Sequence, residues 1–222
     1  LWSTAVFFLN FEFIFNLPTE DKSYLSALKK RLLKLLDYEK ITAPFKKGAG
    51  DQGPNAPYNA AAKFYKAYTG NINQVDFLGI SHLGYDRKYS TAEDINSFFP
   101  LEALKRAELA GKVGELSTRY YGAPTNRSQA TTIKKDCTDL LNFIEEDGVD
   151  TVLLVPNWPV CHQTVSLIAR HLEGNGIPTV IVGSAKDIVE HCSVPRFLFS
   201  DFPLGNSAGK PNDLASQDKT LD

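Results

Sequence analysis

The residues best suited to chemistry lie in the turn from Pro156 to Cys161. The turn follows a continuous apolar run at 151–155 and leads into a helical pattern at Pro159, where the fixed φ of proline favours a first helical turn. Cys161 would therefore lie near the amino end of a helix, where unpaired N–H groups and the helix dipole stabilise a thiolate. A nucleophilic or redox cysteine needs a thiol pKa lowered toward ~7. The alternative is a small buried cysteine at a strand–helix turn.

His162 follows Cys161 directly but points about 100° away from it around a helix. It could transfer protons to a group above the strand ends, so Cys161 and His162 are the predicted catalytic residues. Cys137 lies on an apolar helical stripe and is predicted to be structural, whereas the position of Cys192 after a short helix favours neither role. Three cysteines do not make a disulfide framework, and the odd count is typical of a reducing compartment.

A second group of polar residues follows an expected strand at 75–80. Its members could line a site or bind a partner: His82, Asp86, Asp94 and Asn96. A histidine and an aspartate four residues apart are compatible with a metal site, but no second His or Cys stands at ligand spacing, so no metal site is predicted. The alternative is that Asp94 and Asn96 cap the helix that runs through Leu104.

Two glycine-rich segments resemble phosphate-binding loops but lack the required context. Gly48, Gly50 and Gly53 form G-x-G-x-x-G, but PFKK precedes and PNAP follows where the dinucleotide fingerprint needs a strand and a helix. The segment 205–210, GNSAGK, lacks one spacer residue of a Walker A loop and the Ser or Thr after the lysine. We therefore predict no cofactor bound by this chain.

The elements that would position these residues alternate between helices and strands in the second half of the chain. The patterns predict helices at 128–147 and 159–173, a short helix at 187–191, and strands at 151–155, 179–182 and 196–199. Continuous apolar strands are typical of a buried parallel sheet, and the alternation predicts right-handed βαβ units. We therefore predict an α/β fold, doubly wound and Rossmann-like, with a mostly parallel sheet that carries helices on both faces.

Sheets of this kind bind ligands beyond the carboxyl ends of their strands, where the turn from Pro156 to Cys161 would lie. A loop from Asp201 to Asn206 follows the last expected strand. The loop either forms a turn that satisfies its own backbone or folds over the strand ends near Cys161, and the fold logic favours the second. Asp201 and Asn206 are therefore further candidates for binding a substrate or a partner.

The first seventy residues differ from the rest, and we predict an N-terminal extension and linker at 1–70 before an α/β domain at 71–222. Residues 1–16 are rich in phenylalanine and indicate a buried strand pair or an interfacial segment. A basic amphipathic helix from Thr19 and a Gly- and Pro-rich linker at 44–60 follow. We expect residues 1–60 to contact the core less densely than residues 75–210, and proteases to cut first between Lys46 and Tyr58. The absence of methionine suggests a processed chain, a fragment or a partial gene model.

Composition narrows the class of protein. The 222 residues carry 24 Lys and Arg against 26 Asp and Glu, a net charge of −2, which disfavours nucleic-acid binding. No stretch reaches the ~20 uninterrupted apolar residues of a membrane-spanning helix. We therefore expect a soluble, cytoplasmic, globular protein that does not bind a membrane.

Two long segments, 81–122 (SHLGYDRKYS…RYYG) and 158–213 (WPVCHQTVSL…GKPND), resemble the B-component proteins of the glycine, sarcosine, betaine and D-proline reductases. They are most similar to the small, D-proline-reductase-like members, and the resemblance covers residues 76–212. It implies a redox pair in the turn, one member of which is usually selenocysteine. It also implies a substrate amine that is activated as a Schiff base by a pyruvoyl group on a partner subunit, followed by reductive cleavage of a C–N bond.

The resemblance assigns Cys161 to the second position of the redox pair and Trp158 to the first. Tryptophan cannot form a selenenylsulfide or a disulfide, so three explanations stand: a one-thiol enzyme, a non-catalytic paralogue, or a UGA selenocysteine codon translated as tryptophan. The resemblance also implies that His82, Asp86, Asp94 and Asn96 match a recurrent pattern of the family.

Three functional hypotheses follow. The first is a reductase-type subunit, with Cys161 as the reactive thiol, in a hetero-oligomer that includes a pyruvoyl-containing subunit and acts on an amino acid or amine. The second is a catalytically silent binding or assembly subunit of such a complex. The third is a different enzyme that uses Cys161 without a partner thiol.

Overall fold

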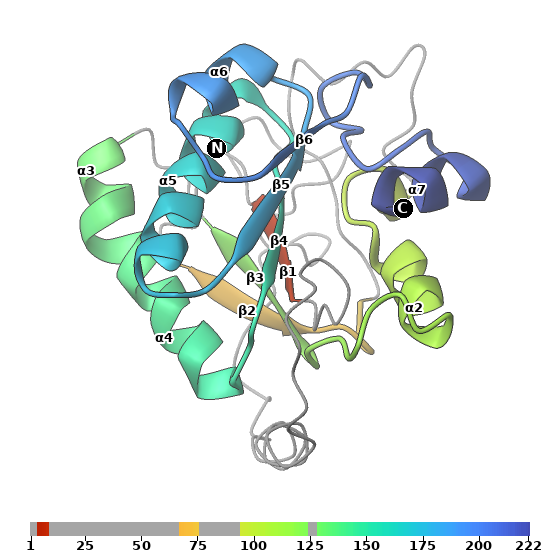
Figure 1. The fold of residues 1–222 in the computed structure, drawn as a ribbon, viewed down its shortest axis with the longest axis horizontal. Coiled ribbons are helices and arrows are strands. Elements are labelled where there is room, and N and C mark those ends of the chain that lie inside the picture. Colours follow the sequence, from red (N-terminus) through yellow and green to blue (C-terminus); the bar gives the residue numbers. More distant parts are fainter. Residues whose placement is uncertain (1–3, 9–66, 76–93, 124–127) are drawn as a thin grey trace, which may run out of the picture.

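The computed structural model describes residues 4–8, 67–75, 94–123 and 128–222. The described residues form a six-stranded sheet with the strand order β2-β3-β1-β4-β5-β6 (Figure 1). The strands are β1 (Thr4–Phe8), β2 (Tyr68–Asn71), β3 (Arg119–Ala123), β4 (Val152–Val155), β5 (Thr179–Gly183) and β6 (Phe197–Phe199). The helix expected from Thr19, the linker at 44–60 and, apart from Val75, the strand expected at 75–80 lie outside the described residues.

The carboxyl-terminal half of the sheet is parallel, as predicted. β4 pairs with β5 through Leu153↔Val180, and β5 pairs with β6 through Val182↔Leu198. Helix α5 (Pro159–Gly174) connects β4 to β5, and α6 (Lys186–His191) connects β5 to β6. The strands and the crossover helices that the alternating pattern predicted here are confirmed.

The other half of the sheet is antiparallel, so the sheet is mixed rather than mostly parallel. β1 lies between β3 and β4 and runs antiparallel to both, and β2 pairs antiparallel with β3. The residues that form β1 belong to the segment predicted as an extension, yet they occupy the middle of the sheet order. β2 (YTGN) and β3 (RYYGA) were not predicted, because both are short and contain glycine, which weakens the strand pattern.

Helices cover both faces of the sheet. Figure 1 shows α3 to α6 on one side, and α2 (Leu101–Leu109) and α7 (Leu214–Leu221) on the other. Side chains alternate along β4: Val152 and Leu154 belong to the apolar cluster under α4 and α5, whereas Leu153 and Val155 belong to the cluster under α2. A strand buried on both faces has to be apolar at every position, which explains the uninterrupted run at 152–155.

The helix predicted at 128–147 is present with one irregular turn. It comprises α3 (Gln129–Thr131), a π-helical turn at Thr132–Asp136 and α4 (Cys137–Asp147). The Ser128 hydroxyl accepts a hydrogen bond from the Thr131 N–H at 3.2 Å, and Gly148 ends the helix with a φ of 63°. Ile133 belongs to the apolar stripe of the helical pattern at 128–147 but is 47% exposed, because the wider π turn rotates the helix face and buries Thr132 and Asp136 instead.

Candidate functional site

The loops that follow the three parallel strands come together at the carboxyl edge of the sheet. The Ser207 hydroxyl donates a hydrogen bond to the Pro156 carbonyl at 2.9 Å, and the Ser184 and Ser207 hydroxyl oxygens are 3.3 Å apart. The loop after β6 therefore folds over the end of β4, as predicted. Asn206 is buried within this loop, whereas Asp201 is exposed.

Cys161 lies near the amino end of α5 and beyond the carboxyl end of β4, as predicted. Pro159 is the first helical residue, and Trp158 is the N-cap with an extended backbone (φ −128°). Cys161 is 0% exposed, as in the alternative of a small buried cysteine that the sequence left open. Its side chain belongs to the apolar cluster under α2, which also contains Trp158, and the side chains of both residues pack in the core.

His162 is buried, and both of its ring nitrogens meet backbone groups. Nδ1 lies 2.7 Å from the Trp158 carbonyl oxygen, while Nε2 accepts hydrogen bonds from the N–H groups of Ser184 at 3.0 Å and Ala185 at 3.1 Å. This pattern assigns the proton to Nδ1 and makes the imidazole neutral. Burial lowers the pKa of His162, although the bond to Trp158 and the charge of Asp187 raise it. His162 therefore joins the turn after β4 to the turn after β5.

Gly183, the last residue of β5, makes this contact possible. A Cβ atom at this position would lie 2.8 Å from His162 Cδ2 and Nε2 and 3.2 Å from Pro156 Cγ. The glycine thus allows the imidazole ring to approach the backbone of β5 closely.

Asp94 and Asn96 act as capping residues, which confirms the alternative that the sequence left open. Asp94 Oδ1 accepts a hydrogen bond from the Asn96 N–H at 3.0 Å and so caps a 3₁₀ turn at Ile95–Ser97. Asn96 Oδ1 accepts from the Glu102 N–H at 3.0 Å in the first turn of α2. A binding role for either residue stays a prediction.

Asp94 also ties the carboxyl terminus to this region. Its Oδ2 accepts hydrogen bonds from the Asn212 N–H at 2.6 Å and from Gln217 Nε2 at 2.8 Å. Burial of Asp94 raises the pKa of its carboxyl, but the hydrogen bonds from Asn212, Asn96 and Gln217 outweigh burial and leave the pKa below its usual value. His82 and Asp86 lie outside the described residues. Within the described ranges, no group of three or more His, Cys, Asp or Glu side chains is arranged to hold a metal ion.

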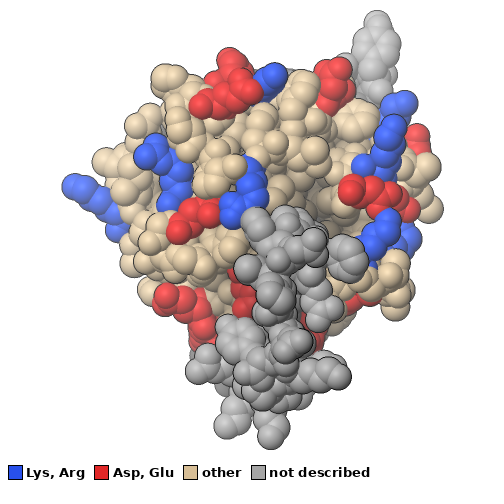
Figure 2. Space-filling model, viewed as in Figure 1, with Lys and Arg blue, Asp and Glu red and all other residues tan. Residues whose placement is uncertain are grey.

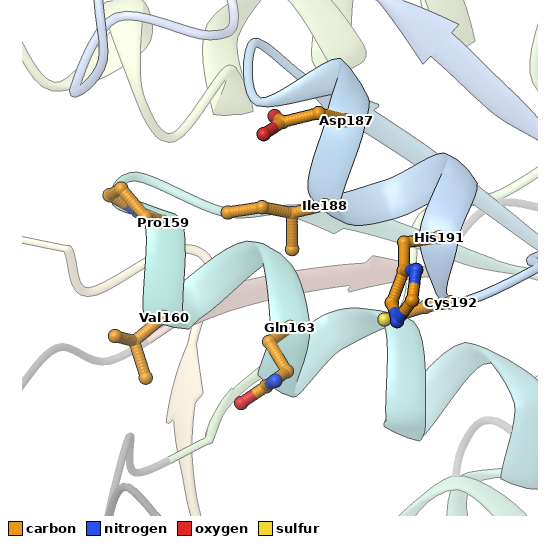
Figure 3. Close-up of a pocket in the computed structure, with 7 residues that line it drawn as sticks. All are labelled: Pro159, Val160, Gln163, Asp187, Ile188, His191 and Cys192. Carbon is orange, nitrogen blue, oxygen red and sulfur yellow. The ribbon is translucent and has the colours of Figure 1, made fainter.

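A pocket of about 430 Å³ lies between α5 and α6 (Figure 3). It is lined by Pro159, Val160, Gln163, Asp187, Ile188, His191 and Cys192. Figure 3 shows Pro159, Val160 and Gln163 on α5, and Asp187, Ile188, His191 and Cys192 on α6 or at its end. The sequence analysis favoured no role for Cys192. One pattern could have indicated its place: Ile188 on α6 and Cys192 at its C-cap are four residues apart and lie on one face.

The cysteines therefore differ in their surroundings. Cys192 is half-buried and lines the pocket, whereas Cys137 and Cys161 are fully buried. Burial, together with the charge of Asp136, raises the pKa of Cys137 to about 12, consistent with its predicted structural role. The three cysteines form no disulfide with one another.

The charges on the described surface are mixed. Figure 2 shows acidic and basic side chains interspersed on this face, without a continuous basic area. Among the helices that the structure describes, none is long and apolar enough to cross a membrane.

Comparison with known proteins gives consistent matches. Residues 50–157 match the model of the glycine/sarcosine/betaine reductase selenoprotein B family. The D-proline reductase subunit gamma of Acetoanaerobium sticklandii is 27% identical over 162 residues, which are 72% of this chain and 66% of that protein. The glycine reductase complex component B subunit gamma of Carboxydothermus hydrogenoformans is 28% identical over 156 residues, 68% of this chain and 35% of that protein.

The betaine reductase complex component B subunit beta of Peptoclostridium acidaminophilum is 28% identical over 132 residues, 56% of this chain and 29% of that protein. The chain thus spans less than two thirds of the length of these curated relatives. No solved structure matches it. The family match ends at Asn157, directly before Trp158, so the assignment of Trp158 and Cys161 to a redox pair depends on the resemblance of segment 158–213. Through residues 50–157, this chain is similar to the glycine/sarcosine/betaine reductase selenoprotein B family.

Proposed function

We propose that this chain is a subunit of a reductase complex that acts on an amino acid or amine derivative and includes a pyruvoyl-containing partner subunit. The support is the family match together with the relatives, whose names describe subunits of D-proline, glycine and betaine reductases. The carboxyl edge of the parallel strands is the position where such a sheet binds ligands. Three connected loops already form that edge around Pro156, Ser184 and Ser207.

Within such a complex, the arrangement of the turn from Pro156 to Cys161 favours an assembly or binding role for this chain, which has tryptophan at position 158. The observation that carries this proposal is the burial of Cys161, which is 0% exposed in an apolar cluster. Trp158 is 5% exposed in the same cluster, and both nitrogens of His162 are occupied by backbone groups. A nucleophilic thiol has to reach its substrate, and a proton-transfer group needs a ring nitrogen available to it. The same burial disfavours a different enzyme that would use Cys161 alone.

The second candidate is a reductive role, and the placement of Cys161 near the amino end of α5 supports it. Residue 158 is the N-cap of α5 and residue 161 is three positions further on, so a selenol at 158 and the thiol of Cys161 would fit on one side of the first turn. In this role the selenol and the thiol would supply two electrons and two protons. The C–N bond of the substrate would break, a C–H bond would form at that carbon, the amine would leave with the second proton, and the selenium and sulfur would be joined as a selenenylsulfide. The role requires that codon 158 is UGA and is read as selenocysteine.

Alkylation kinetics of the folded chain separate the two roles. Iodoacetamide labelling near pH 7, followed residue by residue with mass spectrometry, should modify Cys192 first and leave Cys137 and Cys161 slow, because the latter two are buried. This outcome supports the assembly role. If Cys161 reacts faster than Cys192, its thiol is accessible and activated, and the result supports the reductive role instead of the assembly role. A Cys161→Ser variant identifies the signal that belongs to Cys161.

The gene and a substitution test the reductive role directly. A UGG codon at position 158 would exclude selenocysteine there. Trp158→Cys places a second thiol in the proposed pair, and the variant should form a disulfide with Cys161 and gain reductive turnover when it is combined with the pyruvoyl-containing subunit. A variant that stays reduced and inactive, while circular dichroism shows the wild-type fold, would favour the assembly role.

A further inference from the structure

The edge strand β6 exposes an unusual amount of apolar surface. It is the last strand in the sheet order, and Leu198 and Phe199 are each 44% exposed. Leu198 and Phe199 point to opposite faces of the sheet, because side chains alternate along a strand. Edge strands in soluble proteins are normally protected by charges, prolines or a covering element, so an apolar edge of this kind indicates a surface that pairs with another strand.

The backbone of β6 is arranged for such pairing. The Arg196 carbonyl accepts from the Ile181 N–H at 3.2 Å, and the Ser200 N–H donates to the Gly183 carbonyl at 2.8 Å, so the even-numbered residues bond inward to β5. The N–H and C=O groups of Phe197 and Phe199 therefore point away from the sheet. Within the part of the chain that the structure describes, no hydrogen bond to these outward groups is present.

The sequence of β6 is self-complementary under a two-fold axis perpendicular to the sheet at Leu198. In that antiparallel register Phe197 of one copy faces Phe199 of the other, and these pairs exchange both N–H···O bonds, which is what their outward groups require. Leu198 then faces Leu198 of the second copy as a non-hydrogen-bonded pair, in which side chains lie closest together. Aromatic side chains that face each other across strands add stabilisation.

The charges beside β6 are complementary in the same arrangement. Lys186 and Glu190 form an exposed pair on α6 at 3.6 Å, and the Lys186 ammonium lies 5.9 Å from the centre of the Phe199 ring. The two-fold axis sets the α6 helices of the two copies antiparallel, so Lys186 of one copy is turned toward the Glu190 end of the other. In Figure 2 the uncharged area in the upper centre, where Figure 1 draws β5 and β6, has acidic and basic side chains at its margin.

From the exposed strand, its hydrogen-bond parity and these charges, we infer that β6 pairs with β6 of a second copy of this chain and joins the two sheets into one continuous sheet. The interface is isologous, since the same residues meet on both copies, and closed two-fold dimers are the commonest oligomers. The inference is independent of the proposed function.

Analytical ultracentrifugation of the full chain at micromolar concentration tests it. The wild-type chain should sediment with twice the mass of one chain, and Leu198→Lys should sediment as a monomer, because the substitution places two ammonium groups opposite each other on the axis. Leu109→Lys is the matched control, since Leu109 is 88% exposed on α2, far from β6 in the sequence, and this variant should remain dimeric. A monomeric wild-type chain, or a Leu198→Lys variant that stays dimeric, overturns the inference.

A cysteine cross-link gives a second measurement that does not depend on weakening the interface. Directly opposite residues in a non-hydrogen-bonded antiparallel pair have Cα atoms about 4.5 Å apart, within the range of a disulfide. Leu198→Cys should therefore form a covalent dimer under mild oxidation, whereas the wild-type chain, which retains Cys192, and Leu109→Cys should not. Cross-linking of Leu109→Cys to the same extent as Leu198→Cys would show random collision and overturn the register. If the chain is monomeric alone and β6 pairs only with a different subunit, the partner of β6 is not a second copy and the inference is wrong.

Discussion

At the residue scale, a single imidazole ring holds the ends of β4 and β5 together, and Gly183 makes room for it. The His162 ring is fixed by hydrogen bonds at both nitrogens, so it cannot move away from an added methyl group at Gly183. Gly183→Ala should therefore lower the free energy of unfolding by about 1–3 kcal/mol through overpacking. Gly174→Ala is the control, because a Cβ there meets no atom within 4 Å, and its stability should be unchanged or slightly higher. Equal denaturant midpoints for both variants would contradict this account.

The protonation of the same ring makes stability depend on pH. Burial lowers the pKa of His162 below its ordinary value of 6.5, so the unfolded chain binds a proton before the folded chain does as the pH falls. The stabilisation should be complete above about pH 6.5 and should be lost progressively below it. His162→Gln should flatten this part of the curve, whereas His191→Gln, which changes an exposed side chain, should keep it. Urea unfolding at several pH values measures the stability of both variants. If stability depends on pH in His162→Gln as it does in the wild-type chain, groups other than His162 cause the dependence.

At the scale of elements, Asp94 links the carboxyl-terminal helix α7 to the 3₁₀ turn before α2. Asp94→Ala removes the cap of the 3₁₀ turn and the acceptor for Asn212 and Gln217, which should cost about 1–3 kcal/mol. Asp218→Ala removes another link of α7, a 2.6 Å ion pair with Arg106 whose two side chains are both more than a third exposed, and should cost only about 0–1 kcal/mol. Thermal unfolding followed by circular dichroism compares the two variants. A larger loss of stability in Asp218→Ala than in Asp94→Ala would show that the ion pair with Arg106 is the stronger link.

At the scale of the whole molecule, the two buried clusters meet at β4 and β5. Every residue of β4 is buried, and its two faces belong to different clusters. Hydrogen exchange followed by mass spectrometry should therefore be slowest in β4 and β5, and faster in α6, which covers the sheet from one side and has exposed residues at Lys186, Asp187 and Glu190. Exchange in β4 as fast as in α6 would mean that the sheet does not form the stable centre of the fold.

The alternating pattern of the second half was sufficient to predict its fold. Continuous apolar runs at 152–155 and 179–182, each followed by a helical pattern, led to the parallel strands β4, β5 and β6 and to α5 and α6. Helix boundaries followed from local chemistry as well, since Ser128, Pro159 and Gly148 act within one turn of the helices that they start or end. These features depend on neighbours in the sequence, and a sequence pattern records such neighbours directly.

Tertiary structure alone decided the remainder. The antiparallel half arises because β1 enters the sheet between β3 and β4, a pairing between residues more than a hundred positions apart that no local pattern encodes. The position of Cys161 along α5 was predictable, but its burial was not, because the side chains that cover it come from the separate elements of the cluster under α2. His162 became a link between two turns for the same reason: its partners, Ser184 and Ala185, lie beyond the next strand. The sequence determined which residues stand at the carboxyl edge of the sheet, and long-range packing determined which of them solvent can reach.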